Sequence, residues 1–312
     1  MLRIRRLACL MPFVVGFATQ AVAQTPAARS GPPNPNAPLT AVPLRAGAYW
    51  VKGGVSNTGF VVGDKGVVVI DAQMFGVAAR NAQAEIAKVT PNPVNAIIIT
   101  HSDPDHINGL PGYPAGVEVI AHANTRSDML AALADPHPTF TAPPKALKDY
   151  LPTRIVGDRT TLTLDGVRLV LIHTGPAHTD GDLVTYLPAL KVVFAGDLLT
   201  PEIGLYPGIH LNKHGSSLGW MRSVRAMLAL DADLFVSGHG PPQSRAEIKD
   251  RLKAAEQRRA RIAVLVKQHK TLDEVKVALG DPPPTGVAAL FPTFTETTFT
   301  ELTGGGGADA RK

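Results

Sequence analysis

Short apolar runs alternate with longer amphipathic stretches along most of the chain, a pattern that is typical of α/β proteins. Two β-branched runs, 59–62 and 67–70, flank the turn Gly63-Asp64-Lys65-Gly66 and predict a β-hairpin. A helix pattern follows at 77–89, and the fully apolar strand 96–99 then ends at Thr100. Further strands are expected at 118–121, 161–164, 168–173, 183–187, 192–195 and 234–236, and further helices at 217–230 and 245–268. This alternation predicts sheets that are covered by helices on both faces.

The first 23 residues have the pattern of an export signal. Three arginines, Arg3, Arg5 and Arg6, precede an apolar stretch from Leu7 to Thr19, and Ala21-Val22-Ala23 then offers a small-residue cleavage site. Because this stretch is too short for a stable membrane span, we expect cleavage, no membrane-spanning segment afterwards, and a periplasmic or secreted protein. The choice between Sec and twin-arginine export stays open.

The remaining chain is expected to form one folded domain between two segments that bury little. Residues 24–41 are rich in Pro, Asn, Ser and Ala, which predicts a flexible linker. The domain is expected at 42–303, including a C-terminal helical segment at 245–280. The glycine-rich tail 304–312 is expected to be disordered.

Composition and charge narrow the class of partner. The chain has 312 residues, of which 45% are hydrophobic and 18% charged, with ten histidines and one cysteine. Removal of the signal peptide leaves 28 basic and 26 acidic residues, a formal charge of +2, and no cysteine. Disulfide scaffolds and cysteine metal clusters are therefore excluded. No basic stripe remains for a nucleic acid, so we expect a small-molecule substrate. The oligomeric state is not indicated.

Potential metal ligands follow the apolar strands. The segment THSDPDHINGL places four of them within six residues directly after a buried strand, and three later strand ends each add one. Imidazole and carboxylate groups suit zinc, iron or manganese, and seven such ligands can serve two ions. The candidate ligands are His101, Asp103, Asp105, His106, His178, Asp197 and His239.

Five segments together resemble the metallo-β-lactamase-fold superfamily of metallohydrolases, in the expected order from about Val51 to Pro241. They are SNTGFVVGDKGVVVIDAQ, the HxxxDH core of THSDPDHINGL, GPAHTDGD, FAGD and SGHGP. The resemblance implies a four-layer αββα sandwich with the metal site at one edge of two mixed sheets. It also implies a ligand set similar to that of glyoxalase II. The first metal would take His101, the residue at 103 and His178; the second would take Asp105, His106 and His239; Asp197 would bridge them.

The chain departs from the HxHxDH pattern of this family at Asp103, where the pattern has a second histidine. In one interpretation Asp103 is a replacement ligand, which makes the site more anionic and shifts its preference toward iron or manganese. Flavodiiron relatives resemble this arrangement, although their carboxylate is a glutamate. In the other interpretation Asp103 is too short, and the first position is weak or empty. Two divalent ions are expected, with zinc as the first choice.

If the site is filled, it predicts an exported metal-dependent hydrolase. Asp105 would orient and deprotonate a metal-bound water, and the resulting hydroxide would attack a carbonyl-type bond in a β-lactam, lactone, ester or thioester. Asn57, Lys213 and His214 are candidate substrate contacts, and His210 lies in the same loop as the last two.

The sequence leaves two alternatives to this activity. One is a non-hydrolytic role on the same fold, either in di-iron redox chemistry or as a metal-binding accessory protein. The other is a serine hydrolase, because residues 215–219 match GxSxG. No buried strand precedes that motif, so Ser217 is instead expected to be the N-cap of the following helix.

Overall fold

The computed structural model describes residues 33–136, 141–283 and 291–304. Seven strands form the first sheet, in spatial order from β1 to β7. They are β1 (Thr40–Arg45), β2 (Ala48–Lys52), β3 (Thr58–Val62), β4 (Val67–Ile70), β5 (Val94–Ile98), β6 (Glu118–His122) and β7 (Arg154–Val156). The first four strands pair antiparallel, and the pairs from β4 to β7 are parallel, so the sheet is mixed.

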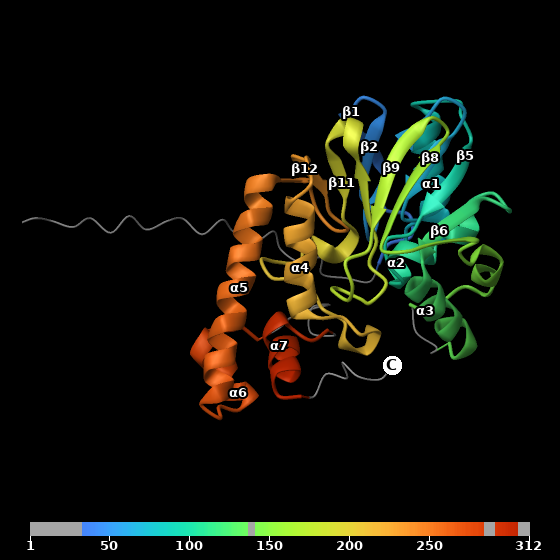
Figure 1. Cartoon of the computed structure of the whole chain (residues 1–312). Helices are drawn as coiled ribbons and strands as arrows, with labels where there is room; N and C mark the ends of the chain where they lie inside the picture. The colour runs from blue at the N-terminus through green and yellow to red at the C-terminus, as the bar shows by residue number, and fades with distance from the viewer. Residues whose placement is uncertain (1–32, 137–140, 284–290, 305–312) are drawn as a thin grey trace, which may run out of the picture.

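Six strands form the second sheet in the order β13-β12-β11-β10-β9-β8. They are β8 (Arg159–Leu164), β9 (Val167–Ile172), β10 (Val184–Leu187), β11 (Val192–Phe194), β12 (Leu234–Val236) and β13 (Gln243–Ser244). The helices are α1 (Gly76–Ala87), α2 (Pro104–Ile107), α3 (Ala123–Ala134), α4 (Ser217–Leu228), α5 (Arg245–Lys267), α6 (Leu272–Leu279) and α7 (Phe294–Leu302). Figure 1 shows α4 and α5 on one side of the sheets and α3 on the other.

Three apolar clusters stack through the molecule and define its layers. The first lies between the two sheets and includes Val68, Ile98 and Phe194. The second joins the first sheet to α1 and α3, and the third joins the second sheet to α4, α5 and α7. Strand β4 is buried along its whole length because alternate side chains enter different clusters. The αββα sandwich that was expected from the sequence is therefore confirmed.

The element boundaries agree closely with the hydrophobic pattern, and the differences occur where the pattern is weak. Strands β1, β2 and β7 and helices α3 and α7 were not predicted individually, because they are short or weakly amphipathic. Strand β1 begins at Thr40, two residues before the expected start of the domain. The predicted signal peptide, the first half of the predicted linker and nearly all of the predicted tail lie outside the described residues.

The expectation that Ser217 is the N-cap of α4 was wrong. The cap is Ser216, whose hydroxyl accepts a hydrogen bond from the backbone N–H of Gly219. Ser217 lies inside the first turn, and its hydroxyl donates to Glu301 on α7. The structure therefore gives Ser217 a packing role between helices α4 and α7.

The two sheets pack closely against each other at Gly59 on β3. A Cβ atom at this position would lie 2.2 Å from the ring of Phe194 on β11, so only glycine leaves room for that ring. We expect Gly59→Ala to lower the free energy of unfolding by about 1–3 kcal/mol, the usual cost of an extra methyl group in a packed core. Urea unfolding measures this. Gly157→Ala is the control, because its Cβ would meet nothing within 4 Å; equal losses in the two variants would contradict the expectation.

Candidate metal centre

The carboxyl ends of strands from both sheets carry the candidate ligands to one edge of the sandwich. Strand β5 is followed by the segment 101–106, whose last residues form the single turn α2. The loops after β9, β11 and β12 carry His178, Asp197 and His239. Because neighbouring strands end at the same edge, residues far apart in the sequence meet there.

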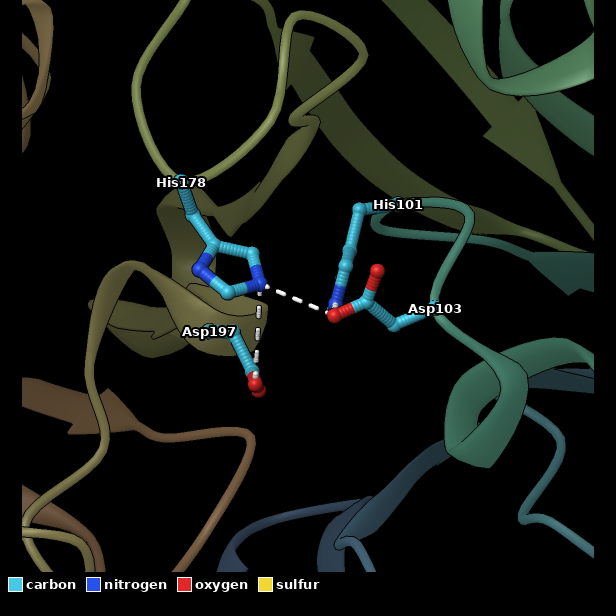
Figure 2. A group of neighbouring side chains, drawn as sticks. All are labelled: His101, Asp103, His178 and Asp197. Atoms are coloured by element: carbon cyan, nitrogen blue, oxygen red, sulfur yellow. Dashed lines mark hydrogen bonds and ion pairs between the residues drawn. The ribbon is translucent and has the colours of Figure 1, made fainter. Parts of the chain in front are cut away.

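The first group of donors contains His101, Asp103, His178 and Asp197, all of them buried (Figure 2). One donor atom from each lies within 4.8 Å of every other. Asp103 Oδ2 is 3.1 Å from His178 Nε2 and 3.6 Å from His101 Nε2. The Asp103 carboxylate therefore reaches the two imidazoles with which it was expected to share a metal position.

The second group contains Asp105, His106 and His239. His239 Nε2 is 3.1 Å from Asp105 Oδ2 and 3.3 Å from Asp197 Oδ2. His106 Nε2 is 3.2 Å from Asp197 Oδ1. Asp197 therefore contacts the second group and also lies within the first, which is the placement that a bridging ligand requires.

Asp71, which follows β4, orients the imidazoles of His101 and His106. It accepts hydrogen bonds from His106 Nδ1 at 2.8 Å and from the backbone N–H and hydroxyl of Thr100, both at 2.8 Å. The Thr100 hydroxyl in turn accepts from His101 Nδ1 at 3.0 Å. Because both Nδ1 atoms donate outward, both Nε2 lone pairs face the ligand cluster. Asp71 adopts a left-handed backbone conformation with φ of 62° to make these contacts.

His178 is fixed by its side chain and by its backbone. Its Nδ1 donates to the carbonyl of Gly208 at 2.9 Å, which directs Nε2 toward Asp103 and Asp197. The Asp182 carboxylate accepts from the backbone N–H of His178 at 2.6 Å and from the hydroxyl of Thr179 at 2.7 Å. Asp182 therefore holds the turn that carries His178, while the ring orientation comes from Gly208.

Opposite charges packed together shift the pKa values of the cluster in opposite directions. Burial lowers the pKa of His178 and His239, but the neighbouring carboxylates outweigh it and raise the two values to about 9 and about 10. Burial raises the pKa of Asp103, but Lys213 and His210 hold it well below its usual range. Without bound metal, imidazolium groups therefore balance the carboxylates, and a metal ion would displace their protons.

Three buried donor atoms without a hydrogen bond show that this set fits a cation. Among the described residues, His101 Nε2, His106 Nε2 and Asp197 Oδ1 are buried and make no hydrogen bond. Buried polar atoms without a hydrogen bond are costly, and these three face oppositely charged groups inside the cluster at 3.2 to 3.6 Å. Metal coordination would satisfy them, and imidazole and carboxylate are suitable donors for zinc. The seven residues expected as ligands are therefore brought together; their role as ligands remains a prediction.

The three residues expected to contact substrate occupy different positions. The amide of Asn57 donates to the carbonyls of Ser237 at 2.8 Å and Gly240 at 2.7 Å, so it holds the loop that carries His239. Asn57 also lines a cavity of about 310 Å³. Lys213 contacts Asp103 at 2.7 Å and is directed into the cluster. His214 has a left-handed backbone and ends a short 3₁₀ turn. Direct substrate contact by these residues remains a prediction.

The serine-hydrolase alternative does not match the geometry. The hydroxyl of Ser217 binds Glu301, whereas His239 contacts Asp105 and Asp197. A serine hydrolase would also need an acidic residue, and Asp231 and Asp233 follow the GxSxG motif in the chain. These two carboxylates instead form ion pairs with Lys191 and Arg45. Ser217, His239 and the two acidic residues thus contact different partners and do not form a triad.

His122 and His173 pack against each other and form hydrogen bonds with the backbone. Their rings stack at 3.8 Å between centroids, with an interplanar angle of 15°. His122 Nδ1 accepts from the backbone N–H of Asn124 and caps α3, while His173 Nδ1 donates to the carbonyl of Asp182. With Asp158 they form a third group of potential donors. One nitrogen of each ring is therefore already used in a hydrogen bond to the backbone.

Sequence reasoning missed two residues of the site. Asp71 stands in a quoted motif but was not singled out, although it follows an apolar strand just as Asp197 does. His210 was noted only as part of the loop after Asp197, yet its Nδ1 lies 3.3 Å from Asp103 Oδ2. No spacing in the sequence identifies His210, because only the folded path of the loop 198–216 places it beside Asp103.

Comparison with protein families agrees with this geometry. The family model described as the metallo-beta-lactamase superfamily matches residues 51–239. This range begins on β2 and ends at His239, so it contains all seven candidate ligands.

Two curated relatives have different activities in their names. The alpha subunit of 2,4-dinitroanisole O-demethylase from Nocardioides sp. (strain JS1661) is 27% identical over 217 residues, which cover 68% of this chain and 60% of the relative. The linear primary-alkylsulfatase from Pseudomonas sp. (strain ATCC 19151) is 24% identical over 231 residues, 59% of this chain and 41% of the relative. The chain thus spans about half the length of the curated relatives it matches.

Solved structures show the same fold. A stereoselective inverting sec-alkylsulfatase from Pseudomonas sp. aligns with a TM-score of 0.64 at 20% identity, covering 88% of this chain and 51% of the other. A metallo-beta-lactamase from Pontibacter korlensis aligns with a TM-score of 0.57 at 19% identity, covering 70% of this chain and 99% of the other.

We expect Asp71→Asn to weaken metal binding about 10- to 100-fold, because the amide removes one acceptor from the network that orients His101 and His106. Competition with a chromophoric zinc chelator measures the affinity. Asp165→Asn is a matched control, since Asp165 also has a left-handed backbone but its carboxylate bonds to Asn95 outside the site. Equal affinities in Asp71→Asn and the unmodified protein would contradict this role.

Proposed function

Because the chain belongs to the metallo-beta-lactamase superfamily, we propose that it is a zinc-dependent hydrolase that uses two divalent ions to cleave an ester-type bond in a small molecule. The observation that carries the proposal is the cluster of seven donor residues, three of which have buried atoms without a hydrogen bond. Bound at these residues, divalent ions would supply Lewis acidity and a water of lowered pKa.

Asp105 is proposed as the residue that orients and deprotonates the attacking water. Its side chain is 19% exposed, compared with 9% for Asp103 and 7% for Asp197, so it is the site carboxylate most open to solvent. Burial raises its pKa, but His106 and His239 outweigh that effect and keep it ionised. An ionised carboxylate at the open side of the cluster can accept a proton from incoming water.

An apolar side chain beside the site supports a substrate with an alkyl or aryl group. Phe291 is about half exposed, and its ring stacks on that of His210 at 5.7 Å between centroids. Exposed apolar groups next to a polar cluster are typical of ligand sites.

The named relatives support the same substrate class. One is an alkylsulfatase and another acts on 2,4-dinitroanisole, and both names describe compounds in which oxygen joins an alkyl or aryl group. We therefore extend the expected carbonyl esters and lactones to include sulfate esters. A β-lactam is a less suitable substrate, because Lys213, a cation at the cluster that could bind its carboxylate, is already paired with Asp103.

We expect zinc-loaded protein to hydrolyse p-nitrophenyl acetate or a p-nitrophenyl sulfate faster than the chromogenic β-lactam nitrocefin. Removal of metal by a chelator should abolish turnover, and zinc should restore it. Asp105→Asn should lower kcat about 100-fold or more, because the loss of a positioned general base costs that much. Asp149→Asn, an exposed change beside Lys148, is the control. Fully metal-loaded protein without turnover on any of these compounds would favour the non-hydrolytic alternative.

We also propose that the protein acts outside the cytoplasm. The support is the sequence pattern of residues 1–23; no helix in the described parts of the chain is long and apolar enough to cross a membrane. Expressed at full length in a bacterium with two membranes, the protein should be released by osmotic shock with Gln24 as its first residue. N-terminal sequencing checks this, and an intact Met1 in the cytoplasmic fraction would contradict it.

A further inference from the structure

We propose that His210 is a ligand of the first metal position, where its imidazole replaces the one that the HxHxDH pattern places at 103. The proposal rests on metal binding by this cluster, as in the proposed function. His210 lies in a loop that carries no part of this motif. In this arrangement Lys213 holds Asp103 so that one carboxylate oxygen faces the metal.

The distances around Asp103 Oδ2 have the size expected between ligands of one ion. Three imidazole nitrogens surround this oxygen: His178 Nε2 at 3.1 Å, His210 Nδ1 at 3.3 Å and His101 Nε2 at 3.6 Å. Ligands about 2.1 Å from a tetrahedral zinc ion lie about 3.4 Å apart. The three distances from Asp103 Oδ2 are therefore close to those between ligands of one zinc ion.

The loop holds the His210 ring firmly in this position. Its backbone N–H donates to the carbonyl of His178 at 2.8 Å, and its own carbonyl accepts from the N–H groups of Lys213 and Gly215, both at 2.9 Å. Its ring lies 4.5 Å from that of His178 and stacks parallel on Phe291, with an interplanar angle of 4°. His210 is therefore hydrogen-bonded to the loop that carries His178, and its Nδ1 is directed at Asp103.

Lys213 uses the other oxygen of Asp103. Its ammonium group lies 2.7 Å from Asp103 Oδ1 and 3.1 Å from both the carbonyl and the hydroxyl oxygen of Ser102. These contacts occupy the donors of the ammonium group and leave Oδ2 for the imidazoles. Asp103 is thereby limited to one oxygen at the metal.

The lysine also offsets the charge that Asp103 adds. A carboxylate in place of a neutral histidine makes the first position more anionic by one charge, and the ammonium of Lys213 supplies one positive charge at hydrogen-bond distance. With His101, His178 and His210, the position again has three imidazoles and little net charge. This donor set favours zinc over iron or manganese, which are preferred by sites rich in carboxylates.

The test compares two histidines of the same loop in the full-length protein. Metal is removed with a chelator, and cobalt(II) and zinc(II) are then titrated separately, with the bound metal counted by elemental analysis and the cobalt spectrum recorded. We expect two ions in the unmodified protein. His210→Asn should reduce the affinity of one of the two ions at least 10-fold and weaken the intense visible bands of tetrahedral cobalt. His214→Asn should change neither, because His214 has a left-handed backbone that asparagine tolerates and no role at Asp103.

A second variant tests the role of the lysine. Lys213→Met should still bind two ions, but in competition it should take up more manganese relative to zinc than the unmodified protein does. Thermal unfolding and circular dichroism of each metal-free variant separate a ligand effect from a folding defect. The proposal is overturned if well-folded His210→Asn binds both ions with unchanged affinity and spectrum, or if the unmodified protein binds a single ion that His210→Asn retains. If His210→Asn selectively loses one of the two ions in a protein that shows no turnover, the result supports the ligand role of His210 while contradicting the proposed hydrolysis.

Discussion

The concentration of buried carboxylates at one edge of the sandwich is the constraint on which the rest of the site depends. Asp71, Asp103 and Asp197 are buried and Asp105 is partly buried beside them, so each requires a partner of opposite charge or a hydrogen-bond donor. Asp71 receives backbone and side-chain donors and directs two imidazoles inward. The other three face those imidazoles, and a bound cation would complete the balance. The same contacts therefore orient the histidines and compensate the charge of the carboxylates.

This arrangement also joins the two sheets. The backbone N–H of Leu183 donates to the carbonyl of Thr100 at 2.7 Å, and that of Asn57 donates to the carbonyl of Gly238 at 2.7 Å, so loops of one sheet are tied to loops of the other. Gly196 packs against Thr100 so tightly that a Cβ atom would lie 2.5 Å from its hydroxyl oxygen. The ligand loops are thus held by backbone contacts as well as by the ligands themselves. A site built on such contacts is organised before any metal binds.

The fold and most of the site could be predicted because the signals are local. Apolar strands that end in polar loops identify both the sheets and the ligand positions, as in 96–101 and 192–197. Three features could not be predicted in this way. The cap of α4 fell on the first of two adjacent serines, the left-handed conformation of Asp71 has no sequence signature, and the approach of His210 depends on a loop whose path is set by tertiary contacts. Lys213 was named from its loop as a candidate substrate contact, but its partner Asp103 is 110 residues away and only the folded chain shows the pairing.

The C-terminal helices rest directly on the loop that carries His210. The hydroxyl of Thr297 on α7 donates to the carbonyl of Ile209, Phe291 precedes α7 and stacks on His210, and Glu301 binds Ser217 at the start of α4. Phe291, Thr297 and Glu301 lie beyond the segment that matches the family model. Substitutions in α7 can therefore alter the loop while every motif residue stays the same. Sequences that share all five motifs need not share a metal preference, and the C-terminal helices are the place where such proteins can diverge.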